Sequence, residues 1–308
     1  MHDETEGFEH QRDEDALLPF QLEQSVVRGR VVRLGPLLDD MLGRHAYPVP
    51  VATFLAQTCA MTAALASALK FKGVFTLQTQ TDGPVSRLVV DVTSEGDIRA
   101  CATFDEAEVM SAKAGGLLGS GHLVFTVDQQ ATDERYQGVV PIENDDLTAA
   151  FHTYFKQSEQ IPTGILTFAR KDRDEHWHAG CLMAQRMPRE GGEGEPASLP
   201  QDDTVQEDDW KRVMLLMQTC TADELLDPAL SFEGLLFRLF HEEGVRAYDR
   251  RNLRHECRCS REKVRDLLAS MPKDEIAAMI DEHGKIAVTC HFCSRTYTFE
   301  PDAICPAN

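Results

Sequence analysis

"VFTLQTQTDGPVSRLVVDVTSEGDIRACATF" (residues 74–104) is the stretch that decides the fold. Apolar and polar residues alternate along it, and two turn signals, Asp82-Gly83 and Glu95-Gly96, divide it into three parts. Alternation with a period of two is typical of a half-buried strand, and an acidic residue followed by glycine favours a tight turn. The stretch therefore predicts an antiparallel meander of three strands.

Patterns on both sides extend this meander into a larger domain. The β-branched segment that ends at Gly35, and two apolar segments after the meander, are typical of strands, while Ala- and Leu-rich segments favour helices. The predicted strands are 25–35, 121–129 and 136–142, and the predicted helices are 50–71 and 145–160. We therefore expect an α+β fold, with an N-terminal domain over 16–186 in which helices pack on an antiparallel sheet.

Acidic segments mark the borders of this domain. Residues 1–15 carry seven acids and one arginine, which predicts a disordered acidic tail. Residues 189–209 carry eight acids with several glycines and prolines, which predicts a flexible, self-repelling insert. The whole chain has a formal net charge of -20, which argues against nucleic acid or an anionic membrane as the main partner.

The region 187–248 is predicted to contain the flexible acidic insert followed by a metastable helical linker. Apolar residues recur there at helical spacing, so each of two short helices has an apolar face that something must cover. Glu242 and Glu243 fit a solvated helix end. The candidate switching or client-binding surface consists of Trp210, Met214, Met217, Phe232, Leu236 and Phe240.

Four cysteines distinguish the C-terminal region, 249–308. "HECRCSREKV" (255–264) holds Cys257 and Cys259, and "VTCHFCSRTY" (288–297) holds Cys290 and Cys293, with thirty residues between the two pairs. Four thiolates at this spacing suit one tetrahedral Zn²⁺ per chain, in a closed site without an open position for catalysis. His255 and His291 supply nitrogens nearby, but the four sulfurs are sufficient.

The surroundings of these cysteines favour the thiolate form. Four arginines near them in sequence offset the formal charge of the site, and a helix that begins near Ser260 directs its dipole toward Cys259. The arginines are Arg254, Arg258, Arg261 and Arg295. A second helix, carrying Ile276, Met279 and Ile280, and a hairpin complete a module too small to fold well without metal.

The motif alone leaves two interpretations open. One is a zinc ribbon that never changes state. The other is a redox switch, because each cysteine has a near partner for a disulfide, and oxidation would remove the ligands together with the folding energy that the metal supplies.

A resemblance over nearly all of 18–299 favours the switch. The chain resembles the heat shock protein 33 family of redox-regulated holdase chaperones. Segments that carry the resemblance include "LPFQLE" (18–23), "VRGRVVRLGP" (27–36), "KFKGVFTLQTQTDGPVSRLVVD" (70–91), "ERYQGVVPI" (134–142), "YFKQSEQIPT" (154–163), "LFRLFHEEGVR" (236–246) and the two cysteine pairs. The acidic tail, the acidic insert and Cys305 are departures from the family pattern.

The resemblance implies a specific mechanism. The reduced, zinc-bound form is expected to be an inactive monomer. Oxidative stress is expected to form the disulfides Cys257–Cys259 and Cys290–Cys293, to release zinc and to unfold the linker. The exposed hydrophobic surface then holds unfolding client proteins without ATP, and the oxidised protein forms a homodimer. No catalytic activity is expected, and no phosphate-loop motif is present.

Several remaining features bear on competing functions. Cys59 and Cys101 fit packing positions, whereas Cys181, Cys220 and Cys305 are candidates for accessory redox roles. The N-terminus lacks a signal-like apolar run and the chain shows no stretch of about eighteen apolar residues, so we expect a cytoplasmic protein without a membrane helix. The alternatives are a constitutive zinc ribbon that binds nucleic acid or protein, and a thiol oxidoreductase.

Overall fold

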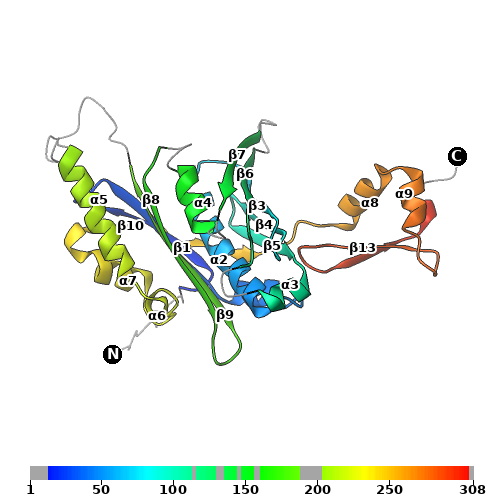
Figure 1. Ribbon diagram of the computed structural model, residues 1–308, viewed down its shortest axis with the longest axis horizontal. Helices are drawn as coiled ribbons and strands as arrows, with labels where there is room; N and C mark the ends of the chain where they lie inside the picture. The colour runs from blue at the N-terminus through cyan, green and yellow to red at the C-terminus, as the bar shows by residue number, and fades with distance from the viewer. Residues whose placement is uncertain are drawn as a thin grey trace, which may run out of the picture.

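The computed structural model describes residues 13–112, 116–129, 135–143, 147–155, 160–187 and 203–304. Two antiparallel sheets enclose a central helix, and a second group of helices covers the far face of the first sheet (Figure 1). The cysteine-containing module extends from the edge of the second sheet. The α+β fold class expected from the sequence is confirmed.

The first sheet has the strand order β10-β1-β2-β9-β8, and β11 pairs with the other end of β1. Only β2 matches a predicted strand; β1, β8 and β9 were not predicted from the hydrophobic pattern. The strands are β1 (Ala16–Leu22), β2 (Val27–Leu34), β8 (Thr163–Lys171), β9 (Trp177–Arg186), β10 (Val245–Ala247) and β11 (Arg251–Asn252).

The second sheet contains the predicted meander. Its order is β12-β5-β4-β3-β6-β7, in which only β12 is parallel to its neighbour. The strands are β3 (Gly73–Thr81), β4 (Arg87–Thr93), β5 (Asp97–Thr103), β6 (Gly121–Gln129), β7 (Arg135–Ile142) and β12 (Arg254–His255). Gly96 closes the β4–β5 turn at a φ of +93°, where a Cβ would lie 2.6 Å from the carbonyl oxygen of Asn252.

Helix α2 (Val49–Ala66) lies between the two sheets and is buried on both faces. Its alanines leave room for strands on either side. By length and composition alone, α2 would be long and apolar enough to cross a membrane, but most of it is buried inside the protein. Its burial in the protein core explains its composition. Nearby lie α1 (Pro36–Leu42), α3 (Glu106–Ser111) and α4 (Leu147–Tyr154).

The acidic segments are shorter than the sequence suggested. Asp13 and Asp15, which we expected in the disordered tail, belong to the fold: the side chain of Asp13 is buried, and Asp15 accepts hydrogen bonds from the amides of Gly35 and Leu37 at the start of α1. Likewise, 203–209 form the first turns of α5 (Asp203–Gln218) rather than a flexible insert. Residues 1–12 and 188–202 lie outside the described part of the chain.

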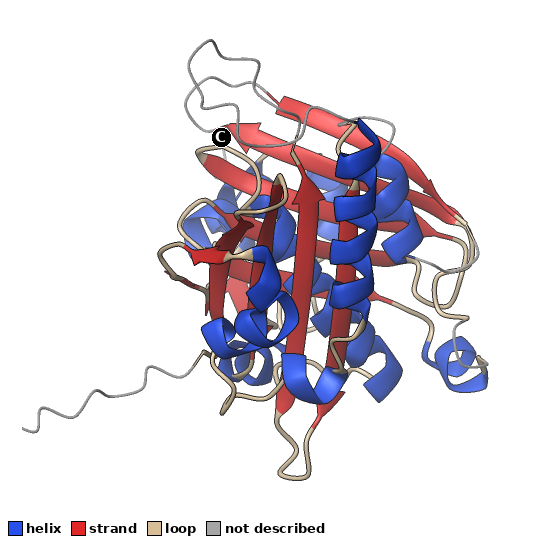
Figure 2. Cartoon of the chain, turned by 90° about the vertical axis from the view of Figure 1, so that its left-hand side faces the viewer, coloured by secondary structure: helices blue, strands red, loops and turns tan. Residues whose placement is uncertain are grey.

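The linker helices cover the face of the first sheet that points away from α2. They are α5, α6 (Ala222–Leu225) and α7 (Phe232–Phe240), followed by a 3-10 turn at His241–Glu243. Figure 2 shows these helices in front of the strands. Apolar side chains of β1, β2 and β9 pack against those of α5 and α7 in one hydrophobic cluster, which supplies the cover that the amphipathic pattern required.

The C-terminal module has a small core of its own. It contains α8 (Arg261–Ala269), α9 (Lys273–Ala278), the hairpin β13 (Ile286–Thr289) and β14 (Thr296–Phe299), and α10 (Pro301–Ile304). Ser260 caps α8 by accepting a hydrogen bond from the amide of Lys263, as predicted. The buried core is limited to Leu268, Ile276, Ile286, Tyr297, Phe299 and Ile304.

Candidate metal centre and its contacts

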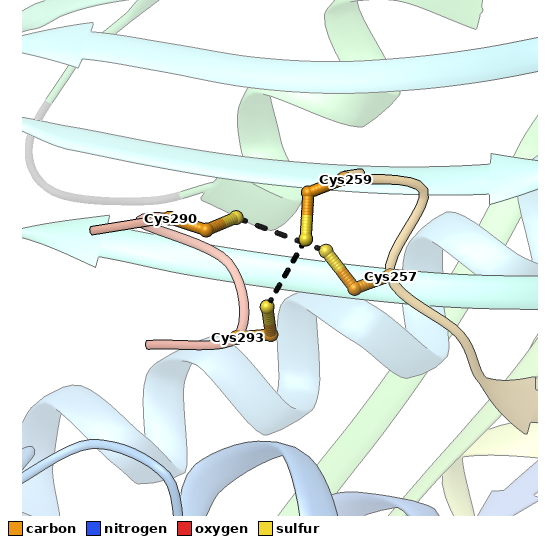
Figure 3. A group of neighbouring side chains, drawn as sticks. All are labelled: Cys257, Cys259, Cys290 and Cys293. Carbon is orange, nitrogen blue, oxygen red and sulfur yellow. Dashed lines mark hydrogen bonds between the residues drawn. The ribbon is translucent and has the colours of Figure 1, made fainter. Parts of the chain in front are cut away.

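Two chain segments bring the four cysteines together. Cys257 and Cys259 follow β12, and Cys290 and Cys293 lie in the turn between β13 and β14 (Figure 3). All four Sγ atoms lie within 4.8 Å of one another. Two close contacts join the two segments: Cys257 to Cys290 at 3.8 Å and Cys259 to Cys293 at 3.4 Å. The four cysteines are free thiols in this arrangement.

These separations fit a tetrahedral ion. With Zn–S bonds of about 2.3 Å, the sulfurs of a four-thiolate site lie about 3.8 Å apart. Within the described part of the chain, this cluster is the one group of potential ligands close enough to hold a metal, and neither His255 nor His291 belongs to it. The donor set therefore fits Zn²⁺, which Cys257, Cys259, Cys290 and Cys293 would hold.

Hydrogen bonds distinguish the four thiols. Burial disfavours a charge on Cys259, but the Tyr297 hydroxyl, which donates to its Sγ at 3.1 Å, and the neighbouring thiols outweigh burial and lower its pKa to about 7. Burial raises the pKa of Cys293 to about 12. Cys259 is thus the sulfur best prepared to be a thiolate before any metal binds.

The four arginines near the cysteines in sequence have different roles. Arg295 lies within electrostatic reach of Cys259 and Cys293, which together with Tyr297 raises its pKa. Arg254 pairs with Asp97, and Arg258 with Asp91. Arg261 donates to the Thr298 carbonyl and lies over the ring of Phe299. Arg295 interacts mainly with the Tyr297 hydroxyl and only secondarily with the thiols, so of the four arginines it alone retains part of the charge-balancing role that we expected of all four.

A buried carboxylate, Asp91, joins the module to the second sheet. It accepts hydrogen bonds from Thr76 at 2.6 Å, from Arg99 at 2.8 Å and from Arg258 of the module at 2.5 Å. The guanidinium of Arg99 also lies 4.0 Å from the ring centroid of Phe292, a residue that stands between Cys290 and Cys293 in the sequence. Burial lowers the pKa of Arg99, but Asp91 and a hydrogen bond with Cys257 outweigh it.

We call the contact of Asp91, Arg99 and His45 with the cysteine module the docking contact. Two histidines, His45 of the N-terminal domain and His255 of the module, contribute further hydrogen bonds between the two parts. His45 donates from Nε2 to the Phe292 carbonyl at 3.2 Å and accepts from Ser294 at Nδ1 at 3.1 Å. Burial lowers the pKa of His45, in keeping with a neutral ring. His255 donates to Asp40 at 2.6 Å. The thiol cluster therefore lies directly against the N-terminal domain.

The predicted switching surface is covered in this structure. Met217, Phe232, Leu236 and Phe240 are buried in the cluster with the first sheet, and Trp210 and Met214 are partly buried against it. Two polar contacts that no local sequence pattern predicted hold these helices in place. The first is made by Arg33 of β2, which donates to the carbonyls of Leu225, Glu224 and Leu230.

The second missed contact is made by Asp13. It accepts from the amide of Phe232 at 2.6 Å and pairs with Arg250 at 2.5 Å. Glu243 also differs from the expected solvated helix end, since it is buried and pairs with Arg212 of α5. No local pattern could have found these residues, because their partners lie far along the chain.

The other described cysteines are poor thiolates. Cys59 and Cys181 are fully buried, and burial raises the pKa of both thiols well above the usual range. Burial also raises the pKa of Cys101 to about 12 and that of Cys220 to about 11. The packing role expected of Cys59 is confirmed, and the accessory redox roles considered for Cys181 and Cys220 find no support. Cys305 lies outside the described residues.

Comparisons with known proteins agree on one family. The family model for the Hsp33 protein matches residues 15–300. A "33 kDa chaperonin" of Caulobacter vibrioides is 40% identical over 298 residues, covering 94% of this chain and 95% of the relative. A "33 kDa chaperonin" of Salmonella typhimurium is 35% identical over 286 residues, covering 92% of each.

A solved structure confirms the fold. The crystal structure of the 33 kDa chaperonin (heat shock protein 33 homolog) of Thermotoga maritima matches with a TM-score of 0.75 at 22% identity, covering 94% of this chain and 96% of that one. The resemblance noted in the sequence is thereby confirmed. From the family match and the identity to these relatives, the chain belongs to the Hsp33 family of chaperones.

Proposed function

We propose that this chaperone is a holdase that oxidation switches on. The observation that carries the proposal is the convergence of four sulfurs within 4.8 Å in a module that has only a small apolar core. Zn²⁺ bound there would keep the sulfurs as thiolates and supply roughly 10 kcal/mol or more of the module's folding free energy. Loss of the thiolates would then unfold the module.

The chemical step is disulfide formation. In each pair, the two sulfurs form one S–S bond and pass two electrons to an oxidant such as hypochlorous acid or a peroxide, and any thiol protons go to water. The proposed disulfides are Cys257–Cys259 and Cys290–Cys293.

Strands at the entrance to the module connect it with the linker. β10 and β11 pair with β1, and β12 pairs with β5, so the chain from the linker to Cys257 is held by both sheets of the N-terminal domain. Unfolding of the module removes the docking contact and frees this segment. We propose that α5 and α7 then leave the first sheet and expose Met217, Phe232, Leu236 and Phe240, together with Trp210 and Met214, to client proteins.

Further features of the proposal follow from this exposure. An exposed apolar sheet and helices favour a homodimer in the oxidised state, and client binding needs no ATP. We place the activity in the cytoplasm during oxidative stress, with no nucleic acid and no membrane as partner. The constitutive zinc ribbon that binds nucleic acid is less favoured, because Arg254 and Arg258 of the module are engaged by Asp97 and Asp91.

The test combines zinc content with chaperone activity. Bound zinc and suppression of aggregation of a denatured client are measured before oxidation, after oxidation and after addition of reductant with zinc. We expect zinc loss to accompany the gain of activity, and reduction with zinc to reverse both. Equal activity in both redox states, or activity with zinc still bound, would contradict the switch.

The acidic insert bears on the threshold of the switch. We propose that like-charge repulsion within 189–209 makes the linker easier to unfold. Most of this segment lies outside the described residues. Deletion of 190–203 is expected to slow activation by oxidant, and an unchanged rate would count against the idea.

A further inference from the structure

A cavity of about 390 Å³ lies on the N-terminal domain, at the segment that leads from the linker to the cysteine module. Its walls come from the end of α2, the β4–β5 turn and β11, and it has an apolar side formed by Leu17, Phe71 and Leu253. Ser67 and Arg251 form part of its polar side. A volume of this size is typical of a site for a small molecule.

Arg251 lines this cavity, and strand register places Arg30 on the same face of the sheet, next to the wall residue Ser67. In β1, Leu17 pairs with Arg251 of β11, and Pro19 pairs with Arg30 of β2. Leu17 and Pro19 are two residues apart and therefore point to the same face of the sheet, as do the partners opposite them. Arg30 and Arg251 thus lie on one face, on either side of β1.

These guanidinium groups have no carboxylate partner among the described residues, although the chain has a net charge of -20. Arg30 makes one long hydrogen bond, 3.4 Å, to the carbonyl of Ser67 in the cavity wall, and its Nε is buried without a hydrogen-bond partner among the described residues. Burial and repulsion from Arg251 and Arg28 lower the pKa of Arg30 to about 10. Arg30 is thus a partly buried cation without an anionic partner among the described residues, and a bound anion would offset the cost of its desolvation.

One acidic side chain stands among the residues that line the cavity, and it is already engaged. Glu95 lines the cavity and accepts a hydrogen bond from Ser94 at 2.8 Å. Arg254, also at the rim, pairs with Asp97 and lies within electrostatic reach of Glu95. The excess positive charge therefore belongs to the side of the cavity that contains Arg251 and Ser67, with Arg30 next to Ser67.

We propose that this cavity binds a small organic phosphate ester, with its phosphate held by Arg30 and Arg251 and its apolar group against Leu17, Phe71 and Leu253. The planar fork of a guanidinium matches phosphate oxygens, and a doubly charged phosphate neutralises two arginines where a carboxylate neutralises one. The ligand would join β2 of the core to the β11 segment. If the redox switch operates, the bound ligand would therefore stabilise the docked, inactive state.

Binding is tested on the reduced, zinc-loaded full-length protein, so the result does not depend on the redox switch. Calorimetric titration with phenyl phosphate is expected to show saturable binding of one molecule per chain. Arg251→Gln and Arg30→Gln are each expected to weaken it at least tenfold. Arg246→Gln is the matched control, since Arg246 lies on the neighbouring strand β10 and pairs with Glu23. It is expected to bind as the unaltered protein does.

Three results would overturn the proposal. The first is that phenyl phosphate does not bind, and the second is that Arg251→Gln leaves its affinity unchanged. The third is that inorganic phosphate binds as tightly as phenyl phosphate, because this would exclude a role for the apolar wall. Arg251 is exposed, so its substitution leaves the core intact. Far-ultraviolet circular dichroism of each variant confirms the fold before titration.

Discussion

At the scale of single residues, the arrangement of four sulfurs separates this site from a set of isolated thiols. A disulfide needs two sulfurs about 2.05 Å apart, whereas the sulfurs of each proposed pair, Cys257–Cys259 and Cys290–Cys293, are free thiols that lie within 4.8 Å of each other. The same four residues can thus hold a metal while reduced and form disulfides after a small movement.

Removal of one ligand is the simplest test at this scale. Cys290→Ser is expected to lower zinc content well below one per chain and to unfold the C-terminal module, because a hydroxyl is a poor substitute for a thiolate. Zinc is measured by atomic absorption, and unfolding by limited proteolysis. Cys101→Ser, a half-buried cysteine outside the cluster, is the control. A Cys290→Ser protein with full zinc content would show that the site is wrongly assigned.

Tyr297 offers a subtler test. Its hydroxyl donates to Cys259, so Tyr297→Phe is expected to raise the pKa of that thiol and weaken zinc binding by about 10- to 100-fold, as is typical when a partner of a ligand is lost. Competition with a chromogenic chelator measures the change. Tyr136→Phe, at an exposed tyrosine of β7, is expected to leave affinity unaltered. Equal affinities of the two variants would exclude a role for the hydroxyl.

At the scale of elements, the linker helices are held by both apolar and polar contacts. α7 buries Leu236 fully against the first sheet, and Arg33 binds carbonyls of the neighbouring turn. The helix is short, so most of its stability derives from this packing rather than from its own propensity.

A mutation that creates a cavity between α7 and the first sheet is therefore expected to release α7 from the sheet. Leu236→Ala should cost about 2–5 kcal/mol of packing free energy and give partial holdase activity in the reduced, zinc-bound state. Phe237→Ala, one residue further on the exposed side of the helix, is the matched control and should remain inactive until oxidised. Suppression of client aggregation is the measurement. An inactive reduced Leu236→Ala protein would disconnect α7 from the switch.

At the scale of the whole molecule, the docking contact links the thiol cluster to the second sheet. Asp91 is buried and accepts hydrogen bonds from two arginines, one in the sheet and one in the module. Hydrogen bonds between charged groups in such a position contribute more than exposed ion pairs.

Loss of the Asp91 charge should weaken the contact between the module and the second sheet without altering any of the four cysteines. Asp91→Asn is expected to weaken docking by about 2 kcal/mol and to speed activation by oxidant. The zinc content of the reduced protein is expected to stay at one ion per chain. The control, Asp128→Asn, alters an exposed ion pair with Arg135. Zinc release is followed with a metal indicator during oxidation. If both variants release zinc at the same rate, docking does not control the switch.

The sequence by itself determined the parts that local chemistry decides. Alternation and turn residues predicted the meander, cysteine spacing predicted the metal ligands that the structure brings together, and Ser260 predicted the start of α8. Each of these depends on residues close in the chain or on a motif with few geometric solutions. The redox role of the cysteines came from the resemblance and remains a proposal.

Only the tertiary structure decided what distant residues do for one another. β1, β8 and β9 lacked a clear alternating pattern because helices cover both faces of the first sheet, so polar faces are largely absent. Arg33, Asp13 and Asp91 read as ordinary charged residues, yet they bind partners that lie 160 or more residues away. Pairing of buried charges depends on which segments the fold brings together, and no local pattern encodes that.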